Sequence, residues 1–257
     1  RSRSPATTQP GRRLRPLPKP GRRLRPEVFR TAGDLARLAR GETVPGLTAP
    51  PSAGLLRGLS GAALLHLELY ELTGERHLLD GARDILHREA AHCVRMPGGS
   101  VQVKDGRRHL LYLDQGSGGF ALVARAYLDH REDPRLSQLL PGVRQGCVLE
   151  FVREPGLFTG RAGLAATAHA LDTASGDGPA RTAPACDVLS SVRNLNWHLV
   201  QDGDRLLVPG AGLRRFSTDL ATGSAGLLLA LHILAARGGT PGPATGPRAL
   251  LSLLTLG

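Results

Sequence analysis

Apolar residues recur at helical spacing along most of the chain, and four of these runs begin in the same way. Each opens with two glycines three residues apart, written G-x-x-G. The blocks are Gly58–Gly61, Gly116–Gly119, Gly160–Gly163 and Gly223–Gly226. Apolar positions at spacings of three and four predict a helix, so we expect each block to open one. In a chain with 33 glycines one such block means little, but four in the same setting indicate an internal repeat.

The segments between the blocks also resemble one another. Apolar spacing predicts a second helix over Glu75–Val94 and another over Asp187–Trp197. Asp105–Gly106 and Asp202–Gly203 each lie between short apolar runs, which is a strong signal for a β-hairpin turn. The predicted order is therefore glycine block, helix, second helix, hairpin or short loop, and the next glycine block.

The glycine spacing has a physical reason. Two glycines three residues apart lie on one face of a helix, and without a Cβ they allow a neighbouring helix or loop to approach closely. Helices of this kind can converge on a narrow axis. The sequence therefore predicts an all-α fold, an α/α toroid of paired helices with the glycine blocks at one rim.

The net charge of +11 is unevenly distributed along the chain. Residues 1–40 carry 11 arginines, Lys19 and only two acidic residues, a net charge of +10. We expect residues 1–50 to form a Pro/Arg-rich linker or disordered arm with one short helix near Glu27–Arg40. Residues 51–239 form the repeat domain and 240–257 a tail containing Gly and Pro. The arm could also bind a polyanion or a membrane surface, but the nearly neutral body argues against a nucleic-acid-binding face.

Other features of the sequence indicate where in the cell the protein is expected. No apolar run has the length of about 18 residues that a membrane span needs. Residues 1–30 hold Pro and Arg where a signal peptide would be apolar. Three widely separated cysteines, at positions 93, 147 and 186, do not suggest a disulfide framework. We therefore expect a cytoplasmic protein.

The glycine blocks and their flanks resemble the lanthionine synthetase C-like family. The resemblance rests on four stretches: GLLRGLSGAALLHLELYELTGE, LDQGSGGFALVARAYL, PGLFTGRAGLAATAHALD and STDLATGSAGLLLALH. They look most like the C-terminal cyclase domain of class III lanthipeptide synthetases, in which a lyase and a kinase precede the cyclase. The resemblance implies an α/α toroid, here an incomplete ring of four units. It also implies addition of peptide Cys thiols to dehydroalanine or dehydrobutyrine, which forms thioether rings.

The family's zinc-dependent members hold the metal with two Cys and one His beside the last glycine blocks. In this chain Phe158–Gly160 and Ala221–Gly223 occupy those places, and none of their side chains binds zinc. The resemblance to class III therefore implies a zinc-independent cyclase with no cofactor in this chain. The chain carries no kinase motif, so a nucleotide is expected only for an upstream kinase part.

Ring closure without zinc needs a base for the thiol and an acid for the enolate. The polar candidates are Asp114 and Asp219, which precede glycine blocks, and His198, which begins the second hairpin. An Asp in that position also commonly caps a helix. The expected partners are a precursor peptide and the kinase and lyase domains of the same polypeptide. Two alternatives stay open: a non-catalytic toroidal module that binds the peptide, and a sugar-active enzyme that uses Asp114 and Asp219 as paired carboxylates.

Overall fold

The computed structural model describes residues 26–50, 52–174 and 186–235. Each glycine block opens a helix, as predicted; these block helices are α2 (Ser60–Thr73), α4 (Ser117–Leu128), α7 (Arg161–Ala174) and α9 (Ser224–Ala235). The other helices are α1 (Pro26–Ala39), α3 (Arg76–Ala90), α5 (Pro134–Ser137), α6 (Leu140–Gly146) and α8 (Cys186–Arg193), followed by the 3-10 turn η1 (Asn194–Trp197). The strands are β1 (Cys93–Arg95), β2 (Val101–Asp105), β3 (Arg108–Leu110), β4 (Val200–Asp202) and β5 (Arg205–Leu207), and the short 3-10 turn η2 (Ala211–Leu213) follows β5.

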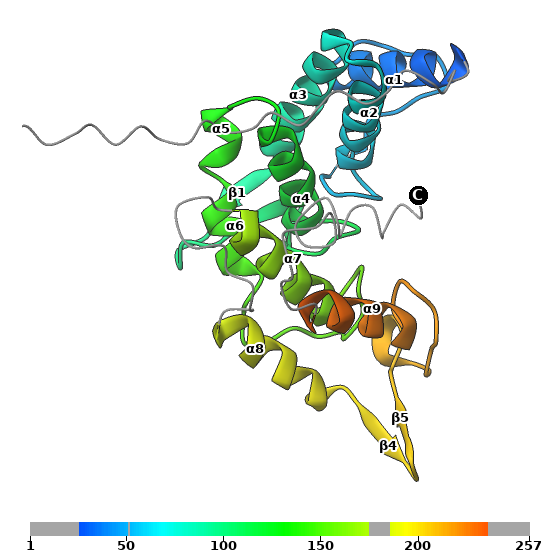
Figure 1. Cartoon of the computed structure of the whole chain (residues 1–257), viewed down its shortest axis with the longest axis vertical. Helices are drawn as coiled ribbons and strands as arrows, with labels where there is room; N and C mark the ends of the chain where they lie inside the picture. The colour runs from blue at the N-terminus through cyan, green and yellow to red at the C-terminus, as the bar shows by residue number, and fades with distance from the viewer. Residues whose placement is uncertain (1–25, 51, 175–185, 236–257) are drawn as a thin grey trace, which may run out of the picture.

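The four block helices form a row in chain order. Helix α2 packs against α4, α4 against α7, and α7 against α9 (Figure 1). A second layer flanks this row: α3 packs on α2, α6 on both α4 and α7, and α8 on α7. The prediction of a mainly helical fold is therefore confirmed, although a three-stranded and a two-stranded sheet accompany the helices.

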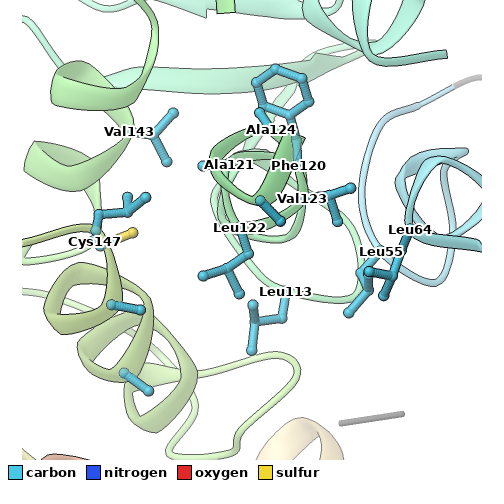
Figure 2. Close-up of a cluster of buried hydrophobic side chains, with 14 of the residues drawn as sticks. Leu55, Leu64, Leu113, Phe120, Ala121, Leu122, Val123, Ala124, Val143 and Cys147 are labelled. Atoms are coloured by element: carbon cyan, nitrogen blue, oxygen red, sulfur yellow. The ribbon is translucent and has the colours of Figure 1, made fainter. Parts of the chain in front are cut away.

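Helix α4 lies at the centre of the hydrophobic core. Phe120, Leu122 and Val123 of α4 are fully buried, and Figure 2 shows them among side chains from the neighbouring helices, including Leu64 of α2 and Val143 of α6. A helix that is apolar on all sides is stable in water only when other elements surround it, which is the position of α4 in the row.

No helix in the described part of the chain combines the length and the apolar character needed to cross a membrane.

The second glycine of each block packs against its own approach segment. We call the five residues before each block the lead-in loops; they are 53–57, 111–115, 155–159 and 218–222. A Cβ on the second glycine would lie less than 3.0 Å from the carbonyl oxygen of the leucine six residues earlier. The pairs are Gly61 with Leu55, Gly119 with Leu113, Gly163 with Leu157, and Gly226 with Leu220. The repeat is therefore L-x-x-G-x-x-G, in which the lead-in loop folds back onto its own helix.

Both predicted hairpins are present, but each turn lies one residue later in the chain than predicted. Asp105 pairs with Arg108, and Asp202 pairs with Arg205, so each two-residue loop starts with glycine. Gly106 and Gly203 have φ values of +59° and +61°, which the first position of such a tight turn requires. The glycine, with no Cβ, takes the loop position, and the Asp before it ends the strand.

Some predicted boundaries changed. The helix predicted over Glu75–Val94 ends at Ala90, because the residues after it pair with β2 as strand β1. The helix predicted over Asp187–Trp197 is present as α8 followed by η1. Helices α5 and α6 were not predicted.

The N-terminal and C-terminal segments fall partly outside the described residues. Helix α1, which lies within the predicted arm, agrees with the expected short helix and packs on α3, where its Ala32 and Ala36 are buried. The part of the predicted arm that forms α1 therefore packs against α2 and α3. Residues 1–25 and the predicted tail 240–257 lie outside the described residues.

Candidate functional site

The four lead-in loops lie side by side at the same end of the row, joined by backbone hydrogen bonds. The Leu55 amide donates to the Leu113 carbonyl at 3.1 Å, and the Leu113 amide donates to the Phe158 carbonyl at 3.1 Å. The Phe158 amide in turn donates to the Ala221 carbonyl at 2.9 Å. Polar side chains borne by these loops therefore gather along one edge, the loop rim.

Asp114 occupies the junction between the first two lead-in loops. Its carbonyl oxygen accepts from the Leu56 and Arg57 amides, each at 3.0 Å, and its carboxylate accepts from the Gln115 amide at 2.6 Å. The Arg57 Nε lies 3.5 Å from the same carboxylate and the rest of the guanidinium side chain is exposed. The residue is only 8% exposed. Burial raises the pKa of Asp114, and the nearby negative charge of Glu154 raises it further against the opposing effects of the Gln115 amide and Arg57.

Glu154 and Tyr112 belong to the same rim, and the sequence analysis did not select them. The Glu154 carboxylate accepts from the Thr159 hydroxyl at 3.0 Å and from the Gly212 amide at 3.3 Å. Burial raises the pKa of Tyr112, and the charge of Glu154 adds to this rise. Glu154 stands six residues before the first glycine of its block, a position taken by Ser217 in the fourth repeat. An alignment of the repeats that begins six residues before the first glycine of each block would have included Glu154.

Asp219 lies on the fourth lead-in loop, where its carboxylate closes a turn. It accepts from the Thr222 amide at 2.7 Å, from the Thr222 hydroxyl at 2.9 Å, and from the Ser217 hydroxyl. These hydrogen bonds, the one from Ser217 foremost, lower the pKa of Asp219 to about 2. Asp219 is exposed on the rim, and its carboxylate is engaged by its own loop. No hydrogen bond joins it to Asp114 within the described residues.

His198 is on none of the lead-in loops and lies near Arg161 at the start of α7. It ends η1, and its neighbour Trp197 lies beneath the guanidinium of Arg161, with the ring centroid 5.6 Å from the Arg161 Cζ. Burial lowers the pKa of His198, and the positive charge of Arg161 lowers it further. The Arg161 guanidinium is fully buried and donates to the Glu150 carbonyl at 2.7 Å, so this cluster fastens η1 and the loop before β4 to α7. The structure therefore places Asp114 and Asp219 on the lead-in loops, whereas His198 belongs to the cluster around Arg161.

The residues at the places of the family's zinc ligands do not fit a zinc ion. Phe158 and Ala221 are hydrogen-bonded neighbours, and Thr159 and Thr222 follow them, so the two places lie next to each other. Phenyl and methyl groups offer no donor atom, and the two threonine hydroxyls already donate to Glu154 and Asp219. Among the described residues no group of three or more His, Cys, Asp or Glu side chains is placed to hold a metal ion.

The cysteines lie away from the loop rim. Cys93 is in β1, Cys147 ends α6 and Cys186 begins α8, and all three are free thiols. Burial raises the pKa of Cys93 to about 12 and that of Cys147 to about 12. Neither thiol can act as a thiolate near neutral pH.

The row of block helices with a polar loop rim defines a helical-repeat protein. The chain is similar to a probable SapB synthase of Streptomyces coelicolor, with 41% identity over 180 residues. The match covers 70% of this chain and 19% of that protein, so the chain spans about a fifth of the relative. No protein-family model matches the chain.

Proposed function

We propose that this chain is the cyclase part of a class III lanthipeptide synthetase, and that its row of helices is an arc of an α/α toroid. Its substrate would be a dehydrated precursor peptide, delivered in the cytoplasm by kinase and lyase domains of the same polypeptide. The observation that carries the proposal is the fourfold L-x-x-G-x-x-G repeat, whose lead-in loops bring Arg57 and Asp114 to one rim, with Glu154 directly before the third loop. The similarity to a probable SapB synthase supports it.

The proposed reaction needs no redox partner. The peptide thiol loses a proton, its sulfur forms a bond to the β-carbon of the dehydro residue, and the carbon–carbon double bond opens to an enolate. A proton then adds to the α-carbon, so the net change is an isomerisation. Asp114 suits both proton steps. Burial raises its pKa above that of an ordinary aspartate, so its carboxylate is a stronger base and can hold and return a proton more readily.

Arg57 is the group that would stabilise negative charge. Its guanidinium lies beside Asp114 and its side chain is 70% exposed, so it can face a bound thiolate or the enolate oxygen without a rearrangement of the core. A cation placed where charge develops lowers the barrier of such an addition. The proposal therefore assigns proton transfer to Asp114 and charge stabilisation to Arg57, with no zinc from this chain.

A second function is favoured by one observation. Phe158 and Ala221 at the places of the zinc ligands are also what a non-catalytic, peptide-binding toroid would tolerate. In that case the rim holds the precursor peptide for the kinase and lyase, and Asp114 serves only to join two loops.

The deciding experiment uses the intact synthetase and its fully dehydrated precursor peptide. Because cyclisation leaves the peptide mass unchanged, the free thiols are alkylated at timed intervals and counted by mass spectrometry. We expect Asp114→Asn to slow ring closure about 100-fold, as loss of a general acid–base does. Arg57→Gln, which changes an exposed side chain and leaves the core intact, is expected to slow it about 10-fold. Asp204→Asn, in the exposed turn of the second hairpin, is the matched control.

The pH dependence separates the two functions. A catalytic Asp114 gives an acidic limb of the rate, at a pH above the ordinary aspartate value of 3.8, and this limb disappears in Asp114→Asn. If Asp114→Asn and Arg57→Gln both close rings at the unaltered rate while deletion of residues 51–257 abolishes peptide binding, the chain is a binding module. A deletion that leaves ring closure unchanged would refute the cyclase proposal.

A further inference from the structure

The contacts between successive repeat units follow one rule. In each junction a lead-in loop donates a backbone amide to the loop of the next unit, from Leu55 and Leu113 three residues before their blocks and from Phe158 two residues before its block. The leucine of each loop also lies over the second glycine of the next unit. A Cβ on Gly119 would lie 2.7 Å from the Leu55 nitrogen, and a Cβ on Gly163 would lie 2.9 Å from a methyl of Leu113. Each unit thus provides one leucine and one donor for the unit that follows.

The fourth unit offers the same leucine with no following unit among the described residues. Leu157 lies over the second glycine of the fourth block, 2.8 Å from the Cβ position of Gly226. Leu220 is the equivalent of Leu157 in the fourth loop, but it is only partly buried, and Ala221 beside it is exposed.

Helix α9 also exposes an apolar side chain at this end of the row. Leu228 stands five residues after the first glycine of its block and is 62% exposed. The residues at the same position of the other three blocks are Ala63, Ala121 and Ala165, and each is 0% exposed. Leu220 and Leu228 therefore belong to an apolar face that continues the interface already repeated three times along the row.

The chain also contains a segment, outside the described residues, whose sequence resembles a lead-in loop. Residues 251–257 read LSLLTLG, in which Leu254 stands three residues before Gly257, as Leu220 stands before Gly223. We propose that residues 251–257 dock on Leu220 and α9 as the lead-in loop of a fifth unit. This inference stands apart from the proposed cyclase activity, since it concerns only how the row of units continues.

The connecting chain is long enough for this placement. Helix α9 ends at Ala235, so residues 236–250 separate it from the docking segment. A fully extended stretch of that length spans about 50 Å. Helix α9 is about 18 Å long, so the connection can return from its C-terminal end to the loop rim with chain to spare.

Disulfide trapping in the full chain tests the register. Phe158 and Ala221, each two residues before its block, are hydrogen-bonded neighbours, so the partner expected for Ala221 is Thr255. We expect Ala221→Cys with Thr255→Cys to form an intramolecular disulfide on mild oxidation, at least tenfold faster than the control pair Ala221→Cys with Ser252→Cys. The control shifts the register by three residues, about 10 Å, and a disulfide bridges Cα atoms only up to about 7 Å apart.

The background for both pairs is Cys186→Ser, because Cys186 is the exposed native thiol. Equal rates for the two pairs, or no intramolecular disulfide in either, would overturn the proposal. Disulfide-linked dimers in place of the intramolecular product would also overturn it and assign the face to a second copy. Hydrogen exchange of α9 supplies a second readout. Leu254→Asp is expected to speed exchange in α9 at least tenfold and to leave α4 unchanged, and unchanged exchange in α9 would count against docking.

Discussion

The two β-hairpins share a sequence pattern and differ in their surroundings. Both carry an Asp-Gly pair between apolar runs, both turn on a glycine with positive φ, and both lead into a glycine block. The first hairpin gains β1 as a third strand, and its Val101 and Val103 are fully buried. The second stays two-stranded, and Figure 1 shows β4 and β5 extending away from the helices.

The difference arises from what covers each hairpin. Helix α6 lies against β2, close enough that a Cβ on Gly142 would lie 2.5 Å from a methyl of Val101. The Ser117 hydroxyl of the following block also donates to the Val101 carbonyl at 3.0 Å. In the second hairpin every residue of β4 is exposed, and Leu206 of β5 is 64% exposed. A hairpin turn is therefore set locally, whereas its burial depends on elements distant in the sequence.

The largest predicted effect tests whether the two hairpins lead into equivalent blocks. Gly119 follows the first hairpin and Gly226 follows the second. In both, an added Cβ would overlap the backbone of the lead-in loop. We expect Gly119→Ala and Gly226→Ala each to lower the free energy of unfolding by about 3 kcal/mol, since backbone cannot move aside as a side chain can. Urea denaturation followed by circular dichroism measures this loss.

Gly98→Ala is the matched control for these two variants. Gly98 lies in the loop between β1 and β2, and an added Cβ there meets nothing within 4 Å. Its unfolding free energy is expected to stay within about 0.5 kcal/mol of the wild type. A large loss in Gly119→Ala together with no loss in Gly226→Ala would mean that the fourth block is not built like the second.

The next prediction concerns the hairpins themselves. Val103→Ala removes two methyl groups from a fully buried site and should cost about 2 kcal/mol. Leu206→Ala removes more carbon from an exposed site and should cost less than about 0.5 kcal/mol. The midpoints of urea unfolding give both values. If Leu206→Ala proves as costly as Val103→Ala, the second hairpin is covered in solution and the contrast between the hairpins fails.

Local sequence signals predicted the elements well and their partners poorly. The glycine blocks, α3 and both turns follow from spacing and from glycine alone. The end of α3 was missed because β1 exists only through its pairing with β2, which no local pattern records. Helix α6 is short and begins with Leu140–Pro141, so it has too few apolar positions for a periodic signal.

The candidate site was predictable in part for the same reason. Asp114 and Asp219 stand next to glycine blocks, so the repeat placed both on one rim. Glu154 was missed because it precedes its block by six residues, and its position on the rim depends on the fold of the lead-in loop. His198 lies elsewhere because η1 and Arg161 hold it beneath α7, an arrangement that sequence adjacency to the hairpin does not reveal.

The last prediction concerns Asp219, which differs from Asp114 although both precede the glycine blocks that follow the hairpins. Burial raises the pKa of Asp114, whereas hydrogen bonds from Ser217 and Thr222 lower the pKa of Asp219 to about 2. A group with a lowered folded-state pKa stabilises the fold above its unfolded-state value, and this contribution is lost as the pH falls through the folded-state value. Asp219→Ala should therefore cost at most about 1 kcal/mol near neutral pH, because the side chain is exposed, and the cost should shrink between about pH 4 and pH 2. Urea unfolding of the wild type and the variant at neutral pH, pH 4 and pH 2.5 measures it. A cost that stays constant over this range would show that the carboxylate charge does not hold the turn.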